Sequence, residues 1–431
     1  MKALQTVRGM HDLLPEQTHR WQALEKDLAQ LFHRYGFSEI RTPILEQAEV
    51  FTRAMGQATD VVEKEMYAFE DRNGDLLCLR PEGTAGVVRS VVQHGLLNPP
   101  GLKVWYQGPM FRHERPQKGR QRQFHQFGAE VFGLAEPTVE VELMALMTRL
   151  WTQLGLSESV ELELNSLGDS EDRQRYREAL VAYLEPHRQA LDEDSQRRLD
   201  SNPLRIFDSK AAQTQALMKD APRLEAYLND DAREHFATVQ RLLDGLGIRY
   251  RINPGLVRGL DYYSRTVFEW TTQALGAQAT VCAGGRYDGL VALAGGKPTP
   301  GVGFAMGAER LLMLLAEGDP DTDTVSRADL YVLSQGQVEG TMQVAETLRD
   351  AFPVMSVGAD LAGGSLKAQF KRADRSGAAI AVMLGEAEWH NRQVILKSLR
   401  PSQGQTDGQA RDQVTVDLDQ LVATIQAWQQ D

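Results

Sequence analysis

Two apolar runs separated by a short, strongly basic loop constrain the fold of this chain more than any other feature. The runs cover residues 102–111 and 124–132, and both have the composition of β-strands. The loop between them carries one carboxylate, Glu114, and a group of cations: Arg112, Arg115, Lys118, Arg120 and Arg122. Two strands joined by so short a connection pair antiparallel. The chain is therefore predicted to build on an antiparallel sheet with a polar loop at one end.

Local patterns elsewhere add a second hairpin and a helix. Asn73-Gly74 between the apolar runs 67–69 and 76–79 is a strong hairpin signal. Apolar residues at helical spacing follow Pro15 and stop before Gly36, which predicts an amphipathic helix with a glycine at its end. The first part of the chain is thus predicted to combine antiparallel strands with flanking helices.

The length of 431 residues exceeds what one hydrophobic core usually supports. Residues 1–316 are predicted to form the first domain, interrupted at 170–246 by a charged segment with helical patterning and no strong strand signal. An acidic, proline-containing stretch at 317–327 is predicted to be a linker. Strand and helix patterns alternate after it, so 328–431 is predicted to be a small α/β domain.

Bulk composition excludes several classes of protein. No apolar run is long enough for a membrane span, and residues 1–8 lack the apolar block of a signal peptide, so a cytoplasmic protein with no membrane contact is expected. Cys78 and Cys282 lie in separate apolar segments, which predicts buried free thiols. The net charge of −12 confines any nucleic-acid contact to basic islands. Besides the loop, one such island repeats every four residues: Lys367, Lys371 and Arg375.

The basic loop carries residue types suited to binding a nucleotide. Arg112 and Glu114 have alternate-residue spacing, so they share one face if the strand continues through them. A guanidinium there could hold a phosphate, the carboxylate could accept from an exocyclic amine, and Phe124 offers a flat face for a base. The alternative is an ordinary solvated loop.

A glycine-rich strand and a buried carboxylate are further candidates. Gly301, Gly303 and Gly307 lead into a helix near Ala308, in a pattern that matches neither a Rossmann nor a Walker motif and alone indicates only tight packing. Arg310 lies in that helix's first turn, where the helix dipole disfavours it, so a partner from elsewhere is expected. A carboxylate among apolar strand residues, as at Glu130, also requires a partner.

These segments resemble those of a known family. Phe111-Arg112-x-Glu114 with its loop and Phe124, and the glycine-rich strand ending in Glu309-Arg310, resemble motifs 2 and 3 of the class II aminoacyl-tRNA synthetases. Three more segments are similar to bacterial histidyl-tRNA synthetases: Arg80-Pro81-Glu82-Gly83-Thr84, residues 256–263 and residues 283–288. The resemblance covers nearly the whole chain and is least specific in the insertion and after Leu399.

The resemblance implies an α+β fold: an antiparallel class II catalytic core with flanking helices and a helical insertion, and a C-terminal anticodon-binding α/β domain. It implies a histidine–tRNA ligase that forms histidyl-adenylate from L-histidine and ATP and transfers histidyl to tRNA(His). Mg²⁺ would be held mainly through ATP, without a separate metal site. A homodimer is implied through residues 41–46, which resemble motif 1.

The resemblance also assigns roles to residues. It implies catalytic roles for Arg112 and Arg258. The residues implied for histidine are Glu82, Gly83, Thr84, Arg112, Gln126, Glu130, Arg258, Tyr262 and Tyr263. Those implied for ATP are Arg112, Glu114, Arg120, Phe124, Glu309 and Arg310. Those implied for tRNA are Gln117, Arg122, Lys367, Lys371 and Arg375, although a stripe like the last three is often simply solvated.

Three alternatives stay open at this point. Regulatory subunits of ATP phosphoribosyltransferase resemble histidyl-tRNA synthetases and sense histidine, but they typically lack the anticodon domain and depart at the catalytic arginines. A synthetase for another amino acid is disfavoured by residues 258–263. A pure RNA-binding module would not need arginines on both sides of a glycine-rich strand.

Overall fold

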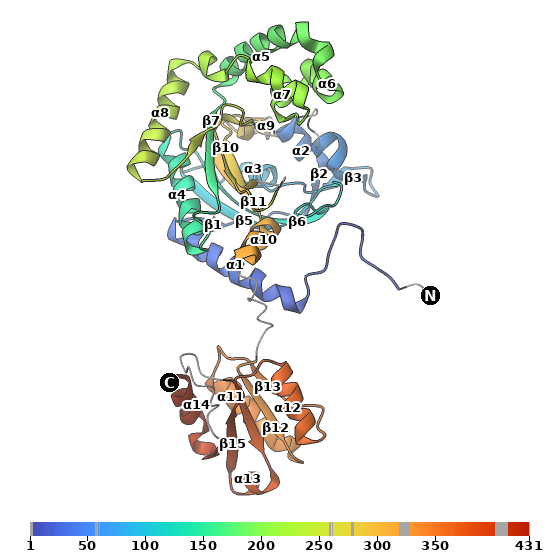
Figure 1. Ribbon diagram of the computed structural model, residues 1–431, viewed down its shortest axis with the longest axis vertical. Coiled ribbons are helices and arrows are strands. Elements are labelled where there is room, and N and C mark those ends of the chain that lie inside the picture. The colour runs from blue at the N-terminus through green and yellow to red at the C-terminus, as the bar shows by residue number, and fades with distance from the viewer. Residues whose placement is uncertain are drawn as a thin grey trace. The chain divides into compact units, whose positions relative to one another are not determined.

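The computed structural model describes residues 3–56, 59, 61–257, 260, 262–276, 280–318, 328–400 and 413–430. They fall into two compact units, one within Met1–Asp12 and Ala23–Pro320 and the other within Leu13–Gln22 and Asp321–Asp431. Figure 1 labels the helices and strands of both units. The predicted linker at 317–327 lies outside the described residues, apart from its first two positions.

The first unit is built on a mainly antiparallel sheet, as the paired runs predict. Within the described residues it has eight strands in the order β1-β5-β6-β11-β10-β9-β7-β8. Their bounds are β1 Ser38–Glu39, β5 Leu102–Phe111, β6 Gln123–Phe132, β7 Glu161–Ser166, β8 Arg251–Ile252, β9 Ser264–Thr271, β10 Thr280–Arg286 and β11 Gly301–Gly307. β5 and β6 pair antiparallel along their whole length, and only the short edge strands β1 and β8 pair parallel.

Two long helices cover one face of this sheet, and short helices pack on part of the opposite face, which also bears a cavity. Side chains alternate across a strand, so Trp105, Phe268 and Phe304 share one face by register. Phe32 of α1 (Pro15–Arg34) stacks on Trp105 with ring centroids 5.0 Å apart. On the same face, Trp151 of α4 (Thr138–Gln153) meets Trp270. The opposite face carries the intervening residues, including Glu130 and Gly303.

A small sheet and short helices adjoin β5. The small sheet has the order β2-β4-β3, with bounds β2 Leu45–Gln47, β3 Tyr67–Glu70 and β4 Leu76–Leu79. The predicted hairpin is present, but its loop spans residues 71–75 rather than a two-residue turn, with Gly74 at φ +88°. The helices are α2 Ala48–Met55, the π-helical turn Val61–Glu65, α3 Thr84–Gln93 and α9 Leu290–Leu293. Cys78 and Cys282 are both buried and neither is in a disulfide, as predicted.

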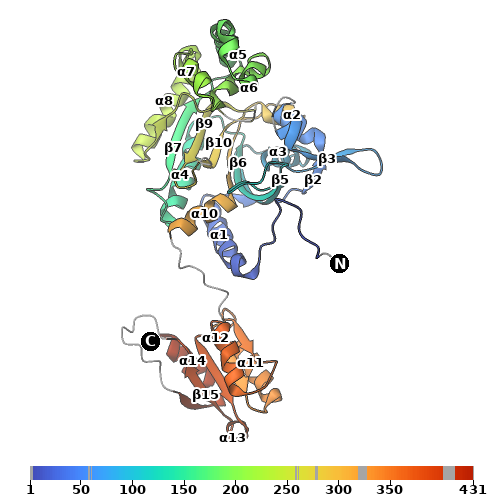
Figure 2. The same ribbon diagram turned by 45° about the vertical axis from the view of Figure 1, so that its right-hand side comes forward.

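The charged segment after β7 is helical. Its helices are α5 Ser170–Leu184, α6 Glu193–Ser201, α7 Ala212–Lys219 and α8 Asp230–Gly245, with short 3-10 turns at Glu185–Ala190, Pro203–Asp208 and Leu224–Tyr227. α5, α6 and α7 gather together beyond the end of the large sheet, whereas α8 runs back beside α4 (Figures 1 and 2). Asp169 begins α5 by accepting the N–H groups of Glu171 and Asp172, each at 2.9 Å.

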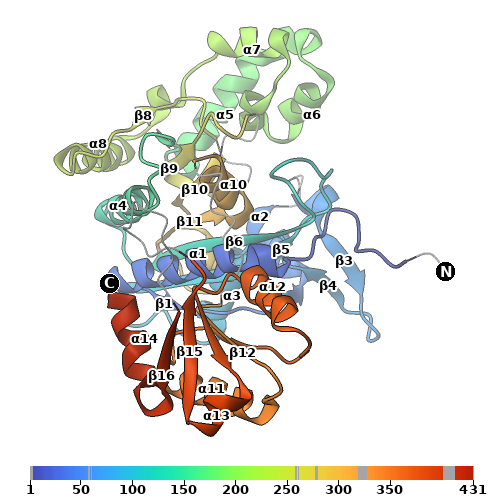
Figure 3. The ribbon, with the colours of Figure 1, turned by 60° about the horizontal axis from the view of Figure 1, so that its bottom comes forward.

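The second unit is an α/β sandwich. Its strands have the order β13-β12-β14-β15-β16, with bounds β12 Leu330–Ser334, β13 Val357–Ala359, β14 Ile380–Leu384, β15 Gln393–Ser398 and β16 Val414–Asp417. Its helices are α11 Val338–Ala351, α12 Leu366–Arg375, α13 Glu386–His390 and α14 Leu421–Gln430, with a 3-10 turn at Leu418–Gln420. The buried clusters place α11 and α14 on one face and α12 on the other (Figure 3). The predicted alternation of strand and helix continues through α13 to β15, but β15 and β16 are antiparallel strands, unlike β12, β13 and β14, which pair parallel.

Among the described residues, no helix combines the length and apolarity needed to cross a membrane.

Candidate active site

The face of the large sheet opposite α1 and α4 bears a cavity of about 210 Å³. This central cavity is lined by residues from the β5–β6 loop, from β6, β10 and β11, and from the starts of α3 and α10 (Ala308–Gly318). Strand alternation explains why Phe124 and Gln126 of β6 both face it. The predicted site residues that line it are Glu82, Thr84, Arg112, Glu114, Arg120, Phe124, Gln126, Tyr262, Tyr263, Glu309 and Arg310. Segments more than 200 residues apart thus meet in one place.

Three guanidinium groups face the cavity, and neighbouring groups fix their positions. Arg112 Nε donates to the carbonyl of Pro81 at 2.9 Å, and its guanidinium lies 5.3 Å from the centre of the Phe124 ring. Arg310 donates to the carbonyls of Gly119 and Thr280 at 3.1 and 2.8 Å, so it does find partners from elsewhere. Burial lowers the pKa of Arg310, and the charge of Arg120 lowers it further. An anion in the cavity would offset that penalty.

One premise about the basic loop was wrong. β5 ends at Phe111, so Arg112 and Glu114 do not share a face through a continuing strand. They reach the cavity from the loop itself, where Glu114 pairs with Arg120 at 3.4 Å.

The polar side of the cavity is built around the first turn of α3. The Glu82 carboxylate accepts the N–H groups of Thr84 and Ala85 at 2.7 Å each, which satisfies donors that a helix start leaves free. Burial raises the pKa of Glu82, and these bonds and the charge of Arg112 oppose the rise. Gln126 Oε1 is buried and has no hydrogen-bond partner within the described part of the chain. It is a ready acceptor for a ligand N–H.

Glu130 lies behind this wall, fully buried. Thr84 Oγ1 donates to its Oε1 at 2.8 Å, and the Tyr287 hydroxyl donates to its Oε2. Burial raises the pKa of Glu130 to about 8, while the hydrogen bonds from Tyr287 and Thr84 act to lower it. Glu130 is not one of the residues that line the cavity, whereas its partner Thr84 is. The partners that its burial required are therefore Thr84 and Tyr287.

Tyr287 is a contact of Glu130 that the sequence interpretation did not single out. It follows β10, whereas Glu130 lies on β6, and β11 runs between these two strands. A Cβ at Gly301 would meet the Tyr287 ring, and one at Gly303 would overlap Glu130 Oε2. The glycines of β11 thus leave room for a tyrosine to reach across a strand. The one available signal was Tyr287's place in the segment 283–288 that resembles the family.

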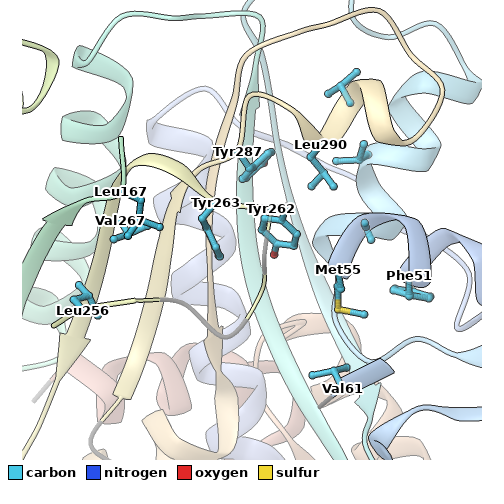
Figure 4. Packing of buried hydrophobic residues seen from close by; sticks show 14 of the residues in the cluster. Phe51, Met55, Val61, Leu167, Leu256, Tyr262, Tyr263, Val267, Tyr287 and Leu290 are labelled. Carbon is cyan, nitrogen blue, oxygen red and sulfur yellow. The ribbon is translucent and has the colours of Figure 1, made fainter. Parts of the chain in front are cut away.

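Two further tyrosines lie beside Tyr287. The ring centroids of Tyr262 lie 4.6 Å from Tyr263 and 5.7 Å from Tyr287, and Figure 4 shows the three side chains near one another. Gly83 does not line the cavity. Its missing side chain instead makes room for the ring of Tyr106.

Other predicted residues lie outside the cavity or have further contacts. Both carboxylate oxygens of Glu309 accept the backbone N–H of His125 at 3.0 Å, and Oε1 also lies 2.9 Å from His125 Nδ1. Arg122 and Gln117 lie on the loop without lining the cavity; Gln117 is exposed and Arg122 Nε donates to the Glu114 carbonyl at 3.2 Å. Arg258 lies outside the described residues.

The second unit carries the other basic island. Lys367, Lys371 and Arg375 are all exposed on α12. Their neighbour Arg372 instead pairs with Asp360 at 2.7 Å. The three exposed cations thus share one helix in a unit separate from the cavity.

Comparisons with known proteins agree with this architecture. The family described as histidyl-tRNA synthetase matches residues 9–311, and the one described as anticodon binding domain matches residues 329–428. The chain is similar to apo histidyl-tRNA synthetase from S. aureus, with 35% identity and a TM-score of 0.78 over 98% of this chain and 99% of that one.

Two more solved structures share the fold at lower identity. Histidyl-tRNA synthetase from Nostoc sp. is 22% identical, with a TM-score of 0.69 over 99% of this chain and all of that one. A Bacillus halodurans protein described as an ATP phosphoribosyltransferase regulatory subunit/histidyl-tRNA synthetase is 21% identical, with a TM-score of 0.64 over 89% of this chain and 99% of that one. The family match over most of the chain and the S. aureus relative decide the assignment: this chain belongs to the histidyl-tRNA synthetase family and is an aminoacyl-tRNA ligase for histidine.

Proposed function

We propose that the central cavity binds histidine and ATP together, joins them as histidyl-adenylate, and presents this intermediate to the 3′ end of tRNA(His). The observation that carries the proposal is the cavity's composition. Arg112, Arg120 and Arg310 face the same space as the buried polar groups Glu82 and Gln126. Cations suit phosphates, and buried acceptors suit an ammonium group.

In the first step, a carboxylate oxygen of histidine attacks the α-phosphorus of ATP. The bond from that phosphorus to the leaving pyrophosphate breaks, and negative charge spreads over the phosphoryl oxygens. Arg112 stabilises this charge at the carboxylate and α-phosphate, and Arg120 and Arg310 hold the distal phosphates. Arg258 is assigned the bridging role by resemblance alone. In the second step a terminal ribose hydroxyl attacks the acyl carbon, and AMP leaves.

The adenine and the amino acid are recognised at different parts of the cavity. Glu114 and Phe124 take the adenine, one by accepting its amine and the other by stacking. Glu82, Thr84 and Gln126 take the α-ammonium group, which would satisfy the unpartnered Gln126 Oε1. Glu130 and Tyr263 read the imidazole, with Tyr262 alongside. An amino acid that leaves these buried groups unpaired is penalised, so selectivity needs no editing step.

Mg²⁺ fits this cavity as an ion carried by ATP. Among the described residues, no group of three or more histidine, cysteine or acidic side chains is arranged to hold a metal. Glu309 and Glu114 line the cavity and offer the oxygen ligands that Mg²⁺ prefers. When bound, the ion would neutralise charge on the pyrophosphate group.

We assign the tRNA contacts to two regions. Gln117 and Arg122 face the acceptor end from the loop, and the exposed cations Lys367, Lys371 and Arg375 meet the anticodon arm. The proposed domains are a catalytic domain at 1–316 with its insertion at 170–246, a linker at 317–327 and an anticodon-binding domain at 328–431. Because its substrates are those of protein synthesis, we place the enzyme in the cytoplasm.

We propose further that two copies form a homodimer through the β2-β4-β3 sheet. Leu45 and Phe69, which lie on one face of this sheet by register, are exposed by 43% and 47%, and Leu76 on its other face is exposed by 56%. Exposed large apolar side chains gathered on one element are typical of an interface.

ATP–pyrophosphate exchange with each of the twenty amino acids tests the activity. Exchange with histidine alone supports the proposal, and no exchange would favour a histidine sensor. For the site, Glu130→Gln replaces a carboxylate by a neutral amide. At about pH 9, where Glu130 is ionised because its pKa is about 8, hydrogen bonds to that charge are worth about 1.5–3 kcal/mol, so the KM for histidine should rise roughly tenfold to hundredfold. The KM for ATP should change by less than about twofold.

The matched control is Glu163→Gln, which alters another buried carboxylate of the same sheet away from the cavity. It should leave both KM values near those of the unmodified enzyme. Equal rises in the two KM values of Glu130→Gln would remove Glu130 from histidine recognition.

A further inference from the structure

A second buried carboxylate lies outside the cavity, on α4. Glu140 is fully buried, as is Arg286, and the two form a bidentate pair with distances of 2.8 Å from Nε and 2.6 Å from Nη2. Burial alone would raise the pKa of Glu140, but hydrogen bonds from His235 and Arg286 lower it below the ordinary value. The pair is therefore ionised, and neither residue lines the cavity.

The third member of this cluster comes from the helical insertion. His235 on α8 lies with Nε2 at 2.6 Å from Glu140 Oε1 and with Nδ1 at 3.3 Å from Arg265 Nη1. A neutral ring with its proton on Nε2 satisfies both contacts, since it donates to the carboxylate and accepts from the guanidinium. His235 thus fixes the oxygen that also accepts from Arg286.

Arg286 connects this cluster to both ends of the Glu130–Tyr287 hydrogen bond. It directly precedes Tyr287 in the chain. Two of its remaining N–H groups donate to the carbonyls of Leu134 and Glu136 at 3.2 Å each, in the segment that follows β6, the strand of Glu130. Nη1 also donates to Asp288 Oδ1 at 3.2 Å, on the other side of Tyr287 in the chain. One guanidinium therefore ties together the two chain segments that lie on either side of β11.

We propose that Glu140, Arg286 and His235 are positioning residues for histidine recognition: they set the place of Tyr287, and through Tyr287 that of the Glu130 carboxylate. The inference rests on the proposed role of Glu130. It gives the helical insertion a part in selecting the amino acid, because α8 supplies His235. A misplaced Tyr287 would leave Glu130 Oε2 without its donor inside a buried site.

The test uses the full-length enzyme and ATP–pyrophosphate exchange. His235→Ala removes the donor to Glu140, whereas His235→Gln retains a side-chain N–H that can reach it. We expect His235→Ala to raise the KM for histidine roughly threefold to tenfold, in line with one lost hydrogen bond, with the KM for ATP nearly unchanged. His235→Gln should restore most of the difference.

A double-mutant cycle decides whether the effect passes through Tyr287. In a Tyr287→Phe background, His235→Ala should raise the KM for histidine no further, because the hydroxyl it positions is already absent. Independent, multiplying effects, or equal rises in both KM values with loss of Tm, would overturn the inference and indicate a purely structural cluster.

The Glu130→Gln variant distinguishes failure of the positioning role from failure of the proposed role of Glu130 in histidine recognition. If Glu130→Gln raises the KM for histidine selectively and His235→Ala does not, only the positioning role fails. If neither does, the proposed role of Glu130 fails with it.

Discussion

Replacing Glu130 by glutamine should stabilise the protein at alkaline pH and change its stability little at acid pH. Burial raises the pKa of Glu130 to about 8, from an ordinary value of 4.5. Between these values the folded protein holds a proton that the unfolded chain has released, so its stability falls as pH rises. This loss of stability is complete once the pH exceeds the pKa of Glu130 in the folded protein. Glutamine has no such proton, and the variant escapes this loss.

The size of the effect follows from the same pKa. At about 1.4 kcal/mol per pH unit, the interval from 4.5 to 8 sets an upper limit on the order of 5 kcal/mol. The amide preserves the local hydrogen bonds, since its oxygen can accept from Thr84 and its N–H can donate to the Tyr287 oxygen. Little is therefore lost at pH 5, where both side chains are neutral.

Thermal unfolding of both proteins without ligand at pH 5.5, 7 and 9 measures the difference in Tm. We expect the advantage of Glu130→Gln to grow steadily with pH. Glu339→Gln, at an exposed position on α11, is the control and should stay within about 0.5 kcal/mol at each pH. A difference independent of pH, or one that grows towards acid, would refute the reasoning from burial.

Three further changes have clear expected outcomes. Gly303→Ala places a methyl group on Glu130 Oε2, so histidine-dependent exchange should fall at least about a hundredfold, and normal exchange would contradict the glycine argument. Deleting everything after Thr324 should abolish efficient tRNA charging while some adenylate formation, measured by exchange, survives; unchanged charging would refute a role for the second unit. Reversing charge with Lys367→Glu and Lys371→Glu should raise the KM for tRNA and leave ATP–pyrophosphate exchange unaffected. An equal effect on exchange would show that these residues do not act through tRNA binding.

Much of the fold could be predicted because helix ends and turns depend on the conformations that a few neighbouring residues favour. Pro15 begins α1 and Gly36, at φ +76°, follows its end, as expected from the conformations these residues favour. The hairpin around Gly74 was predicted for the same reason. β15 and β16 were not predicted, because two short antiparallel strands at the end of an alternating pattern have no strong local signal.

The candidate site depended on information that no local pattern contains. The resemblance identified most residues lining the cavity, but Tyr287 meets Glu130 only because of the register of β6, β11 and β10. The Glu82 carboxylate likewise accepts two N–H groups at the start of α3. This contact could not be predicted without knowing the residue at which the helix begins. Contacts across a sheet are set by tertiary packing, and a reading of single segments cannot supply them.

The glycines of β11, the strand between β6 and β10, also bear on redesign of the enzyme. Glu130, Thr84 and Tyr287 satisfy one another across Gly303, so they form a unit that must be exchanged together. A variant that changes only residue 130 to an apolar side chain leaves the Thr84 and Tyr287 hydroxyl groups without their acceptor. Libraries that aim at a new amino acid should therefore vary these three positions jointly and keep β11 fixed, because its glycines provide the space in which any new set has to fit.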